Sequence, residues 1–177
     1  MSSPLRICLV GATGLIGSAL IEEAVHRSDV RLVGVARREA KLPHGARMEM
    51  LLADPAGWPD AIAASRAKVL VCALGTTIKA VGGDQAAFRA VDHDLVLAVG
   101  RAAQAAGIDH VIVVSSAGSD PMAKSFYLRT KGEMEGALSR LRLRRLDILR
   151  PGLLRGHRET SRPLESVGQV LAPVADL

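Results

Sequence analysis

The sequence predicts an α/β protein with a doubly wound parallel sheet. Short β-branched runs alternate with longer runs of helical character along the chain. The strand-like runs are continuously apolar rather than alternating, which is typical of strands that are buried between two layers of helices. A glycine-rich segment, VGATGLIG, directly follows the first of these runs. Together these observations indicate right-handed βαβ crossovers and the strand order 3-2-1-4-5-6.

The hydrophobic runs predict each element in turn. Strands are expected at 5–11, 31–36, 47–54, 68–75, 110–116 and 146–152. Helices are expected at 15–27, 55–65, 85–106 and 127–141. Gly107 ends the longest helix, because glycine readily adopts the left-handed conformation that closes helices. The first and fourth strands are neighbours in this order, so Cys8 and Cys72 should be buried free thiols on adjacent central strands.

The chain is predicted to be one NAD(P)-binding domain over residues 1–177. Its length is sufficient for a single hydrophobic core. The sequence after Gly152 is polar at first and is broken by two prolines. We therefore expect residues 153–177 to form a short extension on the substrate side of the sheet rather than a second domain.

Composition excludes several classes of function. No apolar run is long enough to span a bilayer, and the first residues lack the pattern of a secretory signal, so we expect a cytoplasmic protein with no membrane partner. Neither the two cysteines nor the five histidines stand at metal-ligand spacing, so no metal site is expected. The formal charge of +5 indicates an anionic partner. The basic stretch SRLRLRRL has no interleaved aromatic residues, which favours a phosphate-rich cofactor over nucleic acid.

The segment VGATGLIG predicts a dinucleotide-binding loop of the Rossmann type. Gly11, Gly14 and Gly17 stand at G-x-x-G-x-x-G spacing between a strand and a helix. The first glycine permits a tight turn, the second lets a diphosphate approach the backbone, and the third lets the helix pack close to the sheet. The helix N-terminus presents free N–H groups to the phosphates. An ordinary glycine-rich turn is the alternative, but the flanking strand and helix favour dinucleotide binding.

The end of the second strand predicts NADP(H) in preference to NAD(H). A protein that prefers NAD usually has Asp or Glu about 20 residues after the loop, where the carboxylate holds the ribose hydroxyls. Here the strand ends in Ala36 and is followed by Arg37 and Arg38. Guanidinium groups can bind a 2′-phosphate with paired hydrogen bonds, whereas a carboxylate would repel it. The alternative is that both arginines are simply solvated in a loop.

Tyr127, the only tyrosine of the chain, precedes Lys131 by four residues. This spacing places both side chains on one face of the helix expected over 127–141. A phenol has a pKa near 10 in water, and a nearby ammonium favours the phenolate. Such a tyrosine can give a proton to a carbonyl oxygen as hydride arrives, or take one in the reverse direction. The alternative is a charged helix surface shared with Glu133 and Glu135.

The blocks GATGLIG, CALGTT, VIVVSSAG, YLRTK and LRPGLL, in this order, resemble the short-chain dehydrogenase/reductase superfamily. The chain most resembles the compact atypical NAD(P)H-binding branch and, to about Glu159, is similar to the Tat-interacting-protein type of oxidoreductase. The resemblance implies catalytic roles for Tyr127 and Lys131, which also contact the cofactor, with Ser115 or Ser116 beside them. It further implies these cofactor contacts: Gly11, Thr13, Gly14, Leu15, Ile16 and Gly17 at the diphosphate, Arg37 and Arg38 at the 2′-phosphate, Asp54 near the adenine, Leu74, Gly75, Thr76 and Thr77 at the ribose and diphosphate, and Pro151, Gly152, Leu153 and Leu154 at the nicotinamide.

The resulting functional hypothesis is an NADPH-dependent oxidoreductase that transfers hydride to a small carbonyl substrate, with Tyr127 as the acid/base. Two alternatives remain open: a non-catalytic NADP(H)-binding regulatory protein, and a flavin-reductase-like enzyme that does not need the tyrosine. Sugar-nucleotide epimerase chemistry is disfavoured, because no substrate domain is expected.

Two further expectations concern the long helix at 85–106. It could pair with the helix at 127–141 across a two-fold axis to form a homodimer, or both helices could pack on the sheet of a monomer. Asp92 stands where many reductases of the superfamily carry an asparagine of a proton relay. We interpret Asp92 as an aspartate on the helix surface, which puts that relay in doubt.

Overall fold

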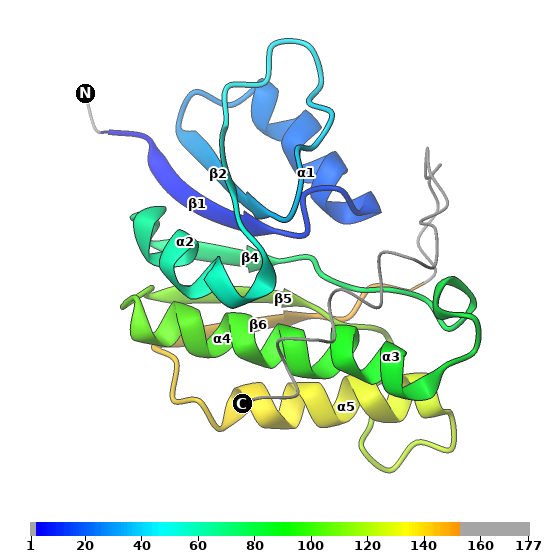
Figure 1. Ribbon diagram of the computed structural model, residues 1–177. Coiled ribbons are helices and arrows are strands. Elements are labelled where there is room, and N and C mark those ends of the chain that lie inside the picture. The colour runs from blue at the N-terminus through cyan, green and yellow to red at the C-terminus, as the bar shows by residue number, and fades with distance from the viewer. Residues whose placement is uncertain (1–2, 153–177) are drawn as a thin grey trace.

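The computed structural model describes residues 3–152, and its core is one six-stranded parallel sheet (Figure 1). The predictions made for residues 153–177, including those for Leu153 and Leu154, lie outside the described residues. The strand order is β3-β2-β1-β4-β5-β6, which confirms the predicted fold class. The strands are β1 (Leu5–Val10), β2 (Val30–Ala36), β3 (Glu49–Leu52), β4 (Val69–Cys72), β5 (His110–Val114) and β6 (Arg145–Leu149).

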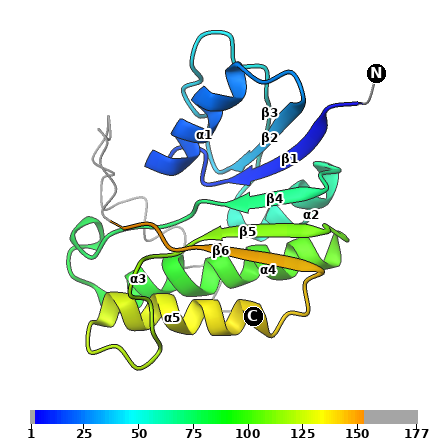
Figure 2. The same ribbon diagram turned by 180° about the vertical axis from the view of Figure 1, so that it is seen from behind.

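Helices lie on both faces of the sheet, as the two opposite views show (Figures 1 and 2). The α-helices are α1 (Leu15–Val25), α2 (Trp58–Ala64), α3 (Gln85–Arg89), α4 (Val96–Ala105) and α5 (Phe126–Ser139). The short 3-10 turns are η1 (Pro55–Gly57) and η2 (Lys79–Val81), and a π-helical turn, η3 (Ala90–Leu95), joins α3 to α4. The order of strands and helices matches the alternation expected from the sequence, although β3 at the edge of the sheet is shorter than the predicted strand.

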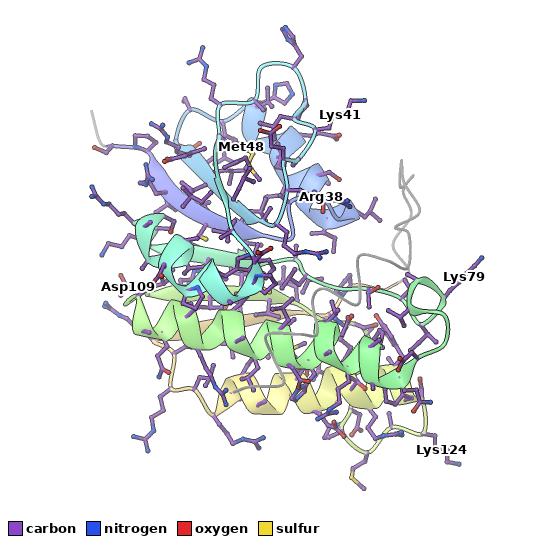
Figure 3. All side chains as sticks on the ribbon, in the orientation of Figure 1. Arg38, Lys41, Met48, Lys79, Asp109 and Lys124 are labelled. Carbon is purple, nitrogen blue, oxygen red and sulfur yellow. The ribbon has the colours of Figure 1, made fainter. Side chains whose placement is uncertain are left out.

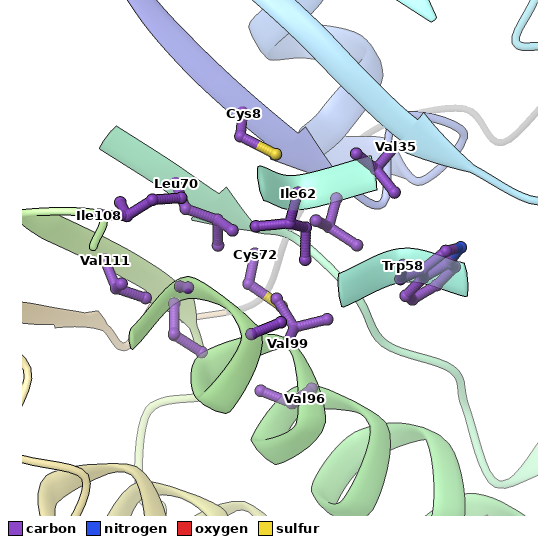
Figure 4. Packing of buried hydrophobic residues seen from close by; sticks show 14 of the residues in the cluster. Cys8, Val35, Trp58, Ile62, Leu70, Cys72, Val96, Val99, Ile108 and Val111 are labelled. Atoms are coloured by element: carbon purple, nitrogen blue, oxygen red, sulfur yellow. The ribbon is translucent and has the colours of Figure 1, made fainter. Parts of the chain in front are cut away.

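The larger hydrophobic core lies between the sheet and the helices α2, α4 and α5. Figure 4 shows Cys8 and Cys72 on neighbouring strands, with Ile62 of α2 and Val99 of α4 close by. Both cysteines are buried free thiols on adjacent strands, as predicted. Burial raises the pKa of each thiol to about 11, so both stay protonated near neutral pH.

The smaller core lies on the other face, beneath α1. Leu9 of β1 and Leu32 of β2 pack there with Ile21 of α1 and with Ala12. Leu9 and the next residue along β1 face opposite cores because successive side chains of a strand alternate between the two faces. Both faces of the central strands are therefore buried, which is why their sequences are continuously apolar.

The predicted long helix at 85–106 is present, but it contains a π-helical turn that the sequence did not reveal. Asp84 caps its start, where the carboxylate accepts hydrogen bonds from the backbone N–H groups of Ala86 and Ala87. The π-helical turn η3 follows α3 directly and interrupts the α-helical geometry of the long helix. Gly107, with φ of +68°, follows the end of α4 as predicted.

The described residues also show whether the requirements for a membrane-spanning helix and for a metal site are met. Over residues 3–152, no helix combines the length and the apolar character needed to cross a membrane. The same residues hold no group of three or more His, Cys, Asp or Glu side chains arranged for a metal ion.

Candidate functional site

The loop between β1 and α1 packs against the backbone at the end of β4. Gly11 has φ of +97°, and a Cβ on it would lie 2.6 Å from the carbonyl carbon of Ala73. A Cβ on Gly17 would lie 2.2 Å from the backbone oxygen of Gly11. Both positions therefore require glycine, which is the role that the sequence predicts for the first and third glycines.

A pocket opens at the carboxyl ends of β1, β2 and β4, where parallel sheets of this kind bind their ligands. Six of the predicted cofactor residues line it: Gly11, Thr13, Arg37, Arg38, Leu74 and Thr76. They come from three separate loops, so the structure brings together residues that are more than 60 positions apart in the chain. Of the other predicted cofactor residues, those within residues 3–152 lie in or next to the same loops, just after β3, or further along the edge toward β5 and β6.

The arginines at the end of β2 sit at one side of this pocket. Arg37 is half-buried and Arg38, which extends from the chain just after β2, is exposed (Figure 3). Burial lowers the pKa of Arg37, and the like charge of Arg38 lowers it further, while nearby Asp54 opposes both effects. Two adjacent cations in a partly desolvated position are suited to an anionic ligand.

The sequence analysis did not predict a cofactor contact for the other seven residues of the pocket lining: Ala12, Val35, Ala36, Trp58, Ala80, Val91 and Leu95. Trp58, the only tryptophan of the chain, is 5% exposed, and its indole N–H donates to the carbonyl oxygen of Ala53 at 2.9 Å. Val91 and Leu95 lie in the π turn η3. The apolar character of these side chains predicted burial, but the sequence alone could not show that they also line a pocket.

Tyr127 lies at the start of α5 and packs against the helix that precedes η3. Its ring centroid is 5.5 Å from that of Phe88, which also contacts Phe126. Ser125 caps this end of α5, where its hydroxyl accepts a hydrogen bond from the N–H of Leu128. The aromatic cluster fixes the tyrosine ring while leaving it only partly buried.

Lys131, one turn after Tyr127, is almost fully buried and forms an ion pair with Asp92. Its Nζ lies 2.7 Å from Oδ1 of Asp92, and the two side chains are 4% and 1% exposed. The second carboxylate oxygen, Oδ2, accepts a hydrogen bond from the backbone N–H of Thr76 at 2.7 Å. A Cβ on Gly75 would lie 3.4 Å from Oδ1 of Asp92 and 3.9 Å from Nζ of Lys131. The ion pair therefore lies directly behind the loop that contributes to the pocket.

The interpretation of Asp92 as a helix-surface aspartate is wrong. Asp92 belongs to the buried stripe of its helix, four residues after Phe88 and four before Val96, and all three are buried. That spacing was a usable signal in the sequence, since an acid on an apolar helical stripe is buried and needs a partner. Which cation supplies the partner depends on the packing of α5, which the spacing does not show.

The two candidate serines at the end of β5 differ in their surroundings. Ser115 is 6% exposed, and its hydroxyl oxygen lies 3.1 Å from that of Ser119. The hydroxyl of Ser119 donates to the carbonyl oxygen of Ser116, so Ser115 is the donor to Ser119. Ser116 is half-buried, and its hydroxyl makes only a long contact of 3.4 Å with the carbonyl oxygen of Ala117.

The segment after β6 runs beside the end of β5. The backbone N–H of Ala117 donates to the carbonyl oxygen of Pro151 at 2.9 Å, which holds Pro151 and Gly152 at the same edge as the serines. Arg150 forms a two-pronged ion pair with Glu135 of α5. The catalytic and nicotinamide-side residues predicted within the described chain thus gather along the carboxyl edge of β4, β5 and β6.

This arrangement defines a nucleotide-binding Rossmann domain: a parallel sheet, a glycine-shaped loop after its first strand, and a pocket across the carboxyl ends of its strands. A family model described as NAD(P)H-binding matches residues 11–172, and the chain belongs to this family. The match confirms the NAD(P)H-binding family that the predicted resemblance implies.

Two fungal relatives illustrate the similarity in sequence. Protein fmp52, mitochondrial, from Emericella nidulans is 32% identical over 174 residues, which cover 94% of this chain and 74% of the relative. Protein FMP52, mitochondrial, from Eremothecium gossypii is 36% identical over 157 residues, which cover 88% and 69% of the two chains. Their names assign no reaction or substrate. These relatives are named as mitochondrial, which contradicts the prediction of a cytoplasmic location. The prediction was wrong because composition alone does not specify a compartment.

Solved structures with a similar fold include enzymes bound to NAD. UDP-glucuronic acid 4-epimerase from Bacillus cereus, in complex with NAD, superposes with a TM-score of 0.70 at 17% identity, covering 88% of this chain and 59% of the epimerase. The Bordetella bronchiseptica enzyme WbmG, in complex with NAD, gives a TM-score of 0.68 at 16% identity, covering 84% and 53%. The chain thus spans little more than half the length of these enzymes, and the likeness shows the shared fold.

Proposed function

We propose that this protein is an NADPH-dependent oxidoreductase that transfers hydride to a small carbonyl substrate, with Tyr127 as the proton donor. The observation that carries the proposal is the position of Lys131, buried directly behind Gly75 and one helical turn from Tyr127. When bound, the cofactor would supply the hydride. The tyrosine would protonate the carbonyl oxygen, and Ser116, the less enclosed of the two serines, would orient that oxygen.

The experiment that tests this proposal is NADPH consumption across a panel of aldehydes and ketones, with Tyr127→Phe beside the parent. This substitution removes only the hydroxyl and keeps the ring that packs on Phe88. We expect turnover to fall by about 100-fold or more, while the dissociation constant for NADPH changes by less than about threefold. Phe126→Leu is the matched control, because it disturbs the same aromatic cluster but keeps the hydroxyl.

Two outcomes would contradict the proposal and favour an alternative. If Tyr127→Phe retains full turnover, and flavin is reduced as well as any carbonyl, a flavin-reductase-like function is supported instead. If the parent reduces neither carbonyls nor flavin but captures a protein partner only in the presence of NADPH, a regulatory function is supported.

We infer a preference for NADPH over NADH from Arg37 and Arg38, which line the pocket beside the phosphate loop. Trp58 lines the same pocket, so quenching of its fluorescence reports binding directly. Replacing both arginines by alanine should weaken NADPH binding by about 100-fold and leave NADH within about threefold, because only NADPH carries the 2′-phosphate. Arg31→Ala, at the other end of β2, is the control for a change in net charge. Equal affinities for both nucleotides in the parent would refute the preference.

The predicted homodimer remains a proposal. A groove runs between α4 and α5 on the side away from the sheet, and Leu97, Gly136 and Leu141 contribute to its lining. A second copy seated there would bury these side chains, and light scattering should then give twice the monomer mass. Gly136→Arg would fill the groove and restore the monomer, whereas a monomeric parent would exclude this interface.

A further inference from the structure

We propose that Asp92 is a positioning residue that neutralises Lys131, ties it to the cofactor loop, and thereby sets the pH range in which Tyr127 acts as an acid. The inference builds on the proposed role of Tyr127 as proton donor. Asp92 does not line the pocket. It lies in η3, and Tyr127 packs against Phe88 of the adjoining helix α3.

The ion pair is enclosed almost completely. Asp92 and Lys131 are 1% and 4% exposed, and their charged atoms are 2.7 Å apart. A single buried charge costs several kcal/mol, so these two groups stabilise each other in the charged state. Seen from the site, the lysine is then half of a neutral pair rather than an isolated cation.

The same carboxylate also holds the cofactor loop. Its second oxygen accepts the backbone N–H of Thr76 at 2.7 Å, and Thr76 lines the pocket. Gly75 lies directly over the pair, since a Cβ there would meet both charged groups. One carboxylate therefore fixes the loop and the ammonium relative to each other, through a hydrogen bond on one oxygen and an ion pair on the other.

Tyr127 lies between the same two helical segments as this pair. Lys131 is one turn after it on α5, and Phe88, against which the tyrosine packs, is one turn before Asp92. An isolated ammonium near a phenol favours the phenolate. An ammonium that is already paired with a carboxylate attracts a phenolate much less. The phenol is the form that donates a proton to a carbonyl oxygen.

Other titratable groups near the pair are accounted for by their own contacts. Cys72 on β4 is a neutral thiol, because burial raises its pKa to about 11. His93 lies 2.6 Å from the carboxylate of Asp94. Arg89 of α3 is paired with Glu133 of α5. When Asp92 is neutralised, the largest electrostatic change at Tyr127 therefore comes from Lys131, which loses its counter-charge.

The test uses the absorbance of tyrosinate, which reports Tyr127 alone because the chain has a single tyrosine. Asp92→Asn keeps an oxygen acceptor for the N–H of Thr76 and removes the negative charge. We expect the midpoint of the tyrosinate titration to shift to lower pH by about one unit, because the phenolate can then stabilise the buried ammonium in place of the lost carboxylate. The alkaline limb of kcat/KM for reduction should move with it. Asp94→Asn, two residues along and half-exposed, is the matched control and should leave the midpoint in place. An unchanged midpoint in Asp92→Asn overturns the proposal.

A second variant keeps the proposal testable if Asp92→Asn fails to fold, as judged by circular dichroism. The double variant Asp92→Asn/Lys131→Met leaves neither charge buried without its partner, and replacing a buried ion pair in this way is often tolerated. Its tyrosinate midpoint should stay within about half a unit of the parent, because a neutral pair has been removed. A rise of about one unit or more would mean that Lys131 acts as an unpaired cation, and would overturn the proposal. The titration needs neither substrate nor cofactor. Shifts as expected in a protein that reduces no carbonyl would support the role of Asp92 and count against the proposed function alone.

Discussion

The two halves of the candidate site are built in different ways. The half beside β1 and β2 is shaped by backbone: Gly11 and Gly17 let the loop, the helix and the end of β4 approach more closely than any side chain would allow. The half beside β5 and α5 is shaped by side chains from distant segments, where Asp92 joins Thr76 to Lys131. In the proposed function, the first half would bind the phosphates that every dinucleotide shares. The second half would position Tyr127 and Lys131 for one particular reaction.

Because of this difference, the two halves should differ in how well they tolerate substitutions. A backbone loop has one geometry, and replacing its glycines forces main-chain atoms apart. A side-chain ion pair has alternatives, since a neutral pair of similar size can occupy the same space. We therefore expect substitutions in the first half to act mainly on stability and cofactor binding, and those in the second to act mainly on the pH dependence and rate of the reaction.

The largest effect on stability is expected from Gly17→Ala. Its Cβ would lie 2.2 Å from the backbone oxygen of Gly11, and no side-chain rotation can relieve that overlap. The free energy of unfolding should fall by about 3 kcal/mol despite the better helix propensity of alanine. Urea unfolding, followed by the fluorescence of Trp58, measures the change.

Gly14→Ala is the matched control for this prediction. Its Cβ would stand 3.4 Å from the nearest backbone atom, and Gly14 has an ordinary extended conformation with φ of −85°. We expect a loss of no more than about 1 kcal/mol. If both variants unfold at the same urea concentration, the close approach of Gly17 to the backbone of Gly11 does not limit stability. The stability of the half beside β1 and β2 would then not depend on this glycine, and the contrast between the two halves would fail.

The second half has a backbone contact of its own, at Gly132 on α5. A Cβ there would lie 2.3 Å from main-chain atoms of Asp120 and Pro121, in the loop that joins β5 to α5. Gly132→Ala should therefore lower the free energy of unfolding by about 2 kcal/mol, because this loop must move away from the helix. Chemical denaturation of the variant and the parent measures the difference.

Gly136, one turn further along α5, provides the control. A Cβ there would meet nothing within 4 Å, so Gly136→Ala should stabilise the protein by up to about 1 kcal/mol through helix propensity alone. Equal stabilisation by both substitutions would show that the loop yields easily. The half beside β5 and α5 would then depend on side chains only, and its contrast with the half beside β1 and β2 would be sharper.

The contrast also explains how much of the site could be predicted. The turn at Gly11 and the two arginines after β2 depend on residues that are close in sequence, so spacing alone predicted the loops that line the pocket. The ion pair of Asp92 joins α5 to a π-helical turn 39 positions earlier, and the contribution of Trp58 to the pocket depends on how α2 packs. Such contacts follow from the tertiary arrangement. The strand order was predictable because apolar runs and right-handed crossovers leave few topologies open.

The smallest effect is expected at the ion pair between Arg89 and Glu133, which links the same two helical segments as Asp92 and Lys131 but lies at the surface. Its side chains are 41% and 35% exposed, against 4% and 1% for the buried pair. The hydrogen bond from Arg89 lowers the pKa of Glu133 below its ordinary value of 4.5. A carboxylate with a depressed pKa contributes its stability above the unfolded-state value and loses it as the pH falls through the folded-state value.

Glu133→Gln should consequently reduce the free energy of unfolding by no more than about 0.5 kcal/mol at pH 7, because water and salt screen an exposed pair. The difference from the parent should shrink as the pH falls below 4.5 and should vanish once Glu133 is protonated in both states. Urea denaturation at several pH values, in low and high salt, measures it. A loss of several kcal/mol that persists in acid would mean that Glu133 supports the packing of α5 rather than an exposed charge pair. Exposure would then no longer distinguish the two ion pairs that join these helices.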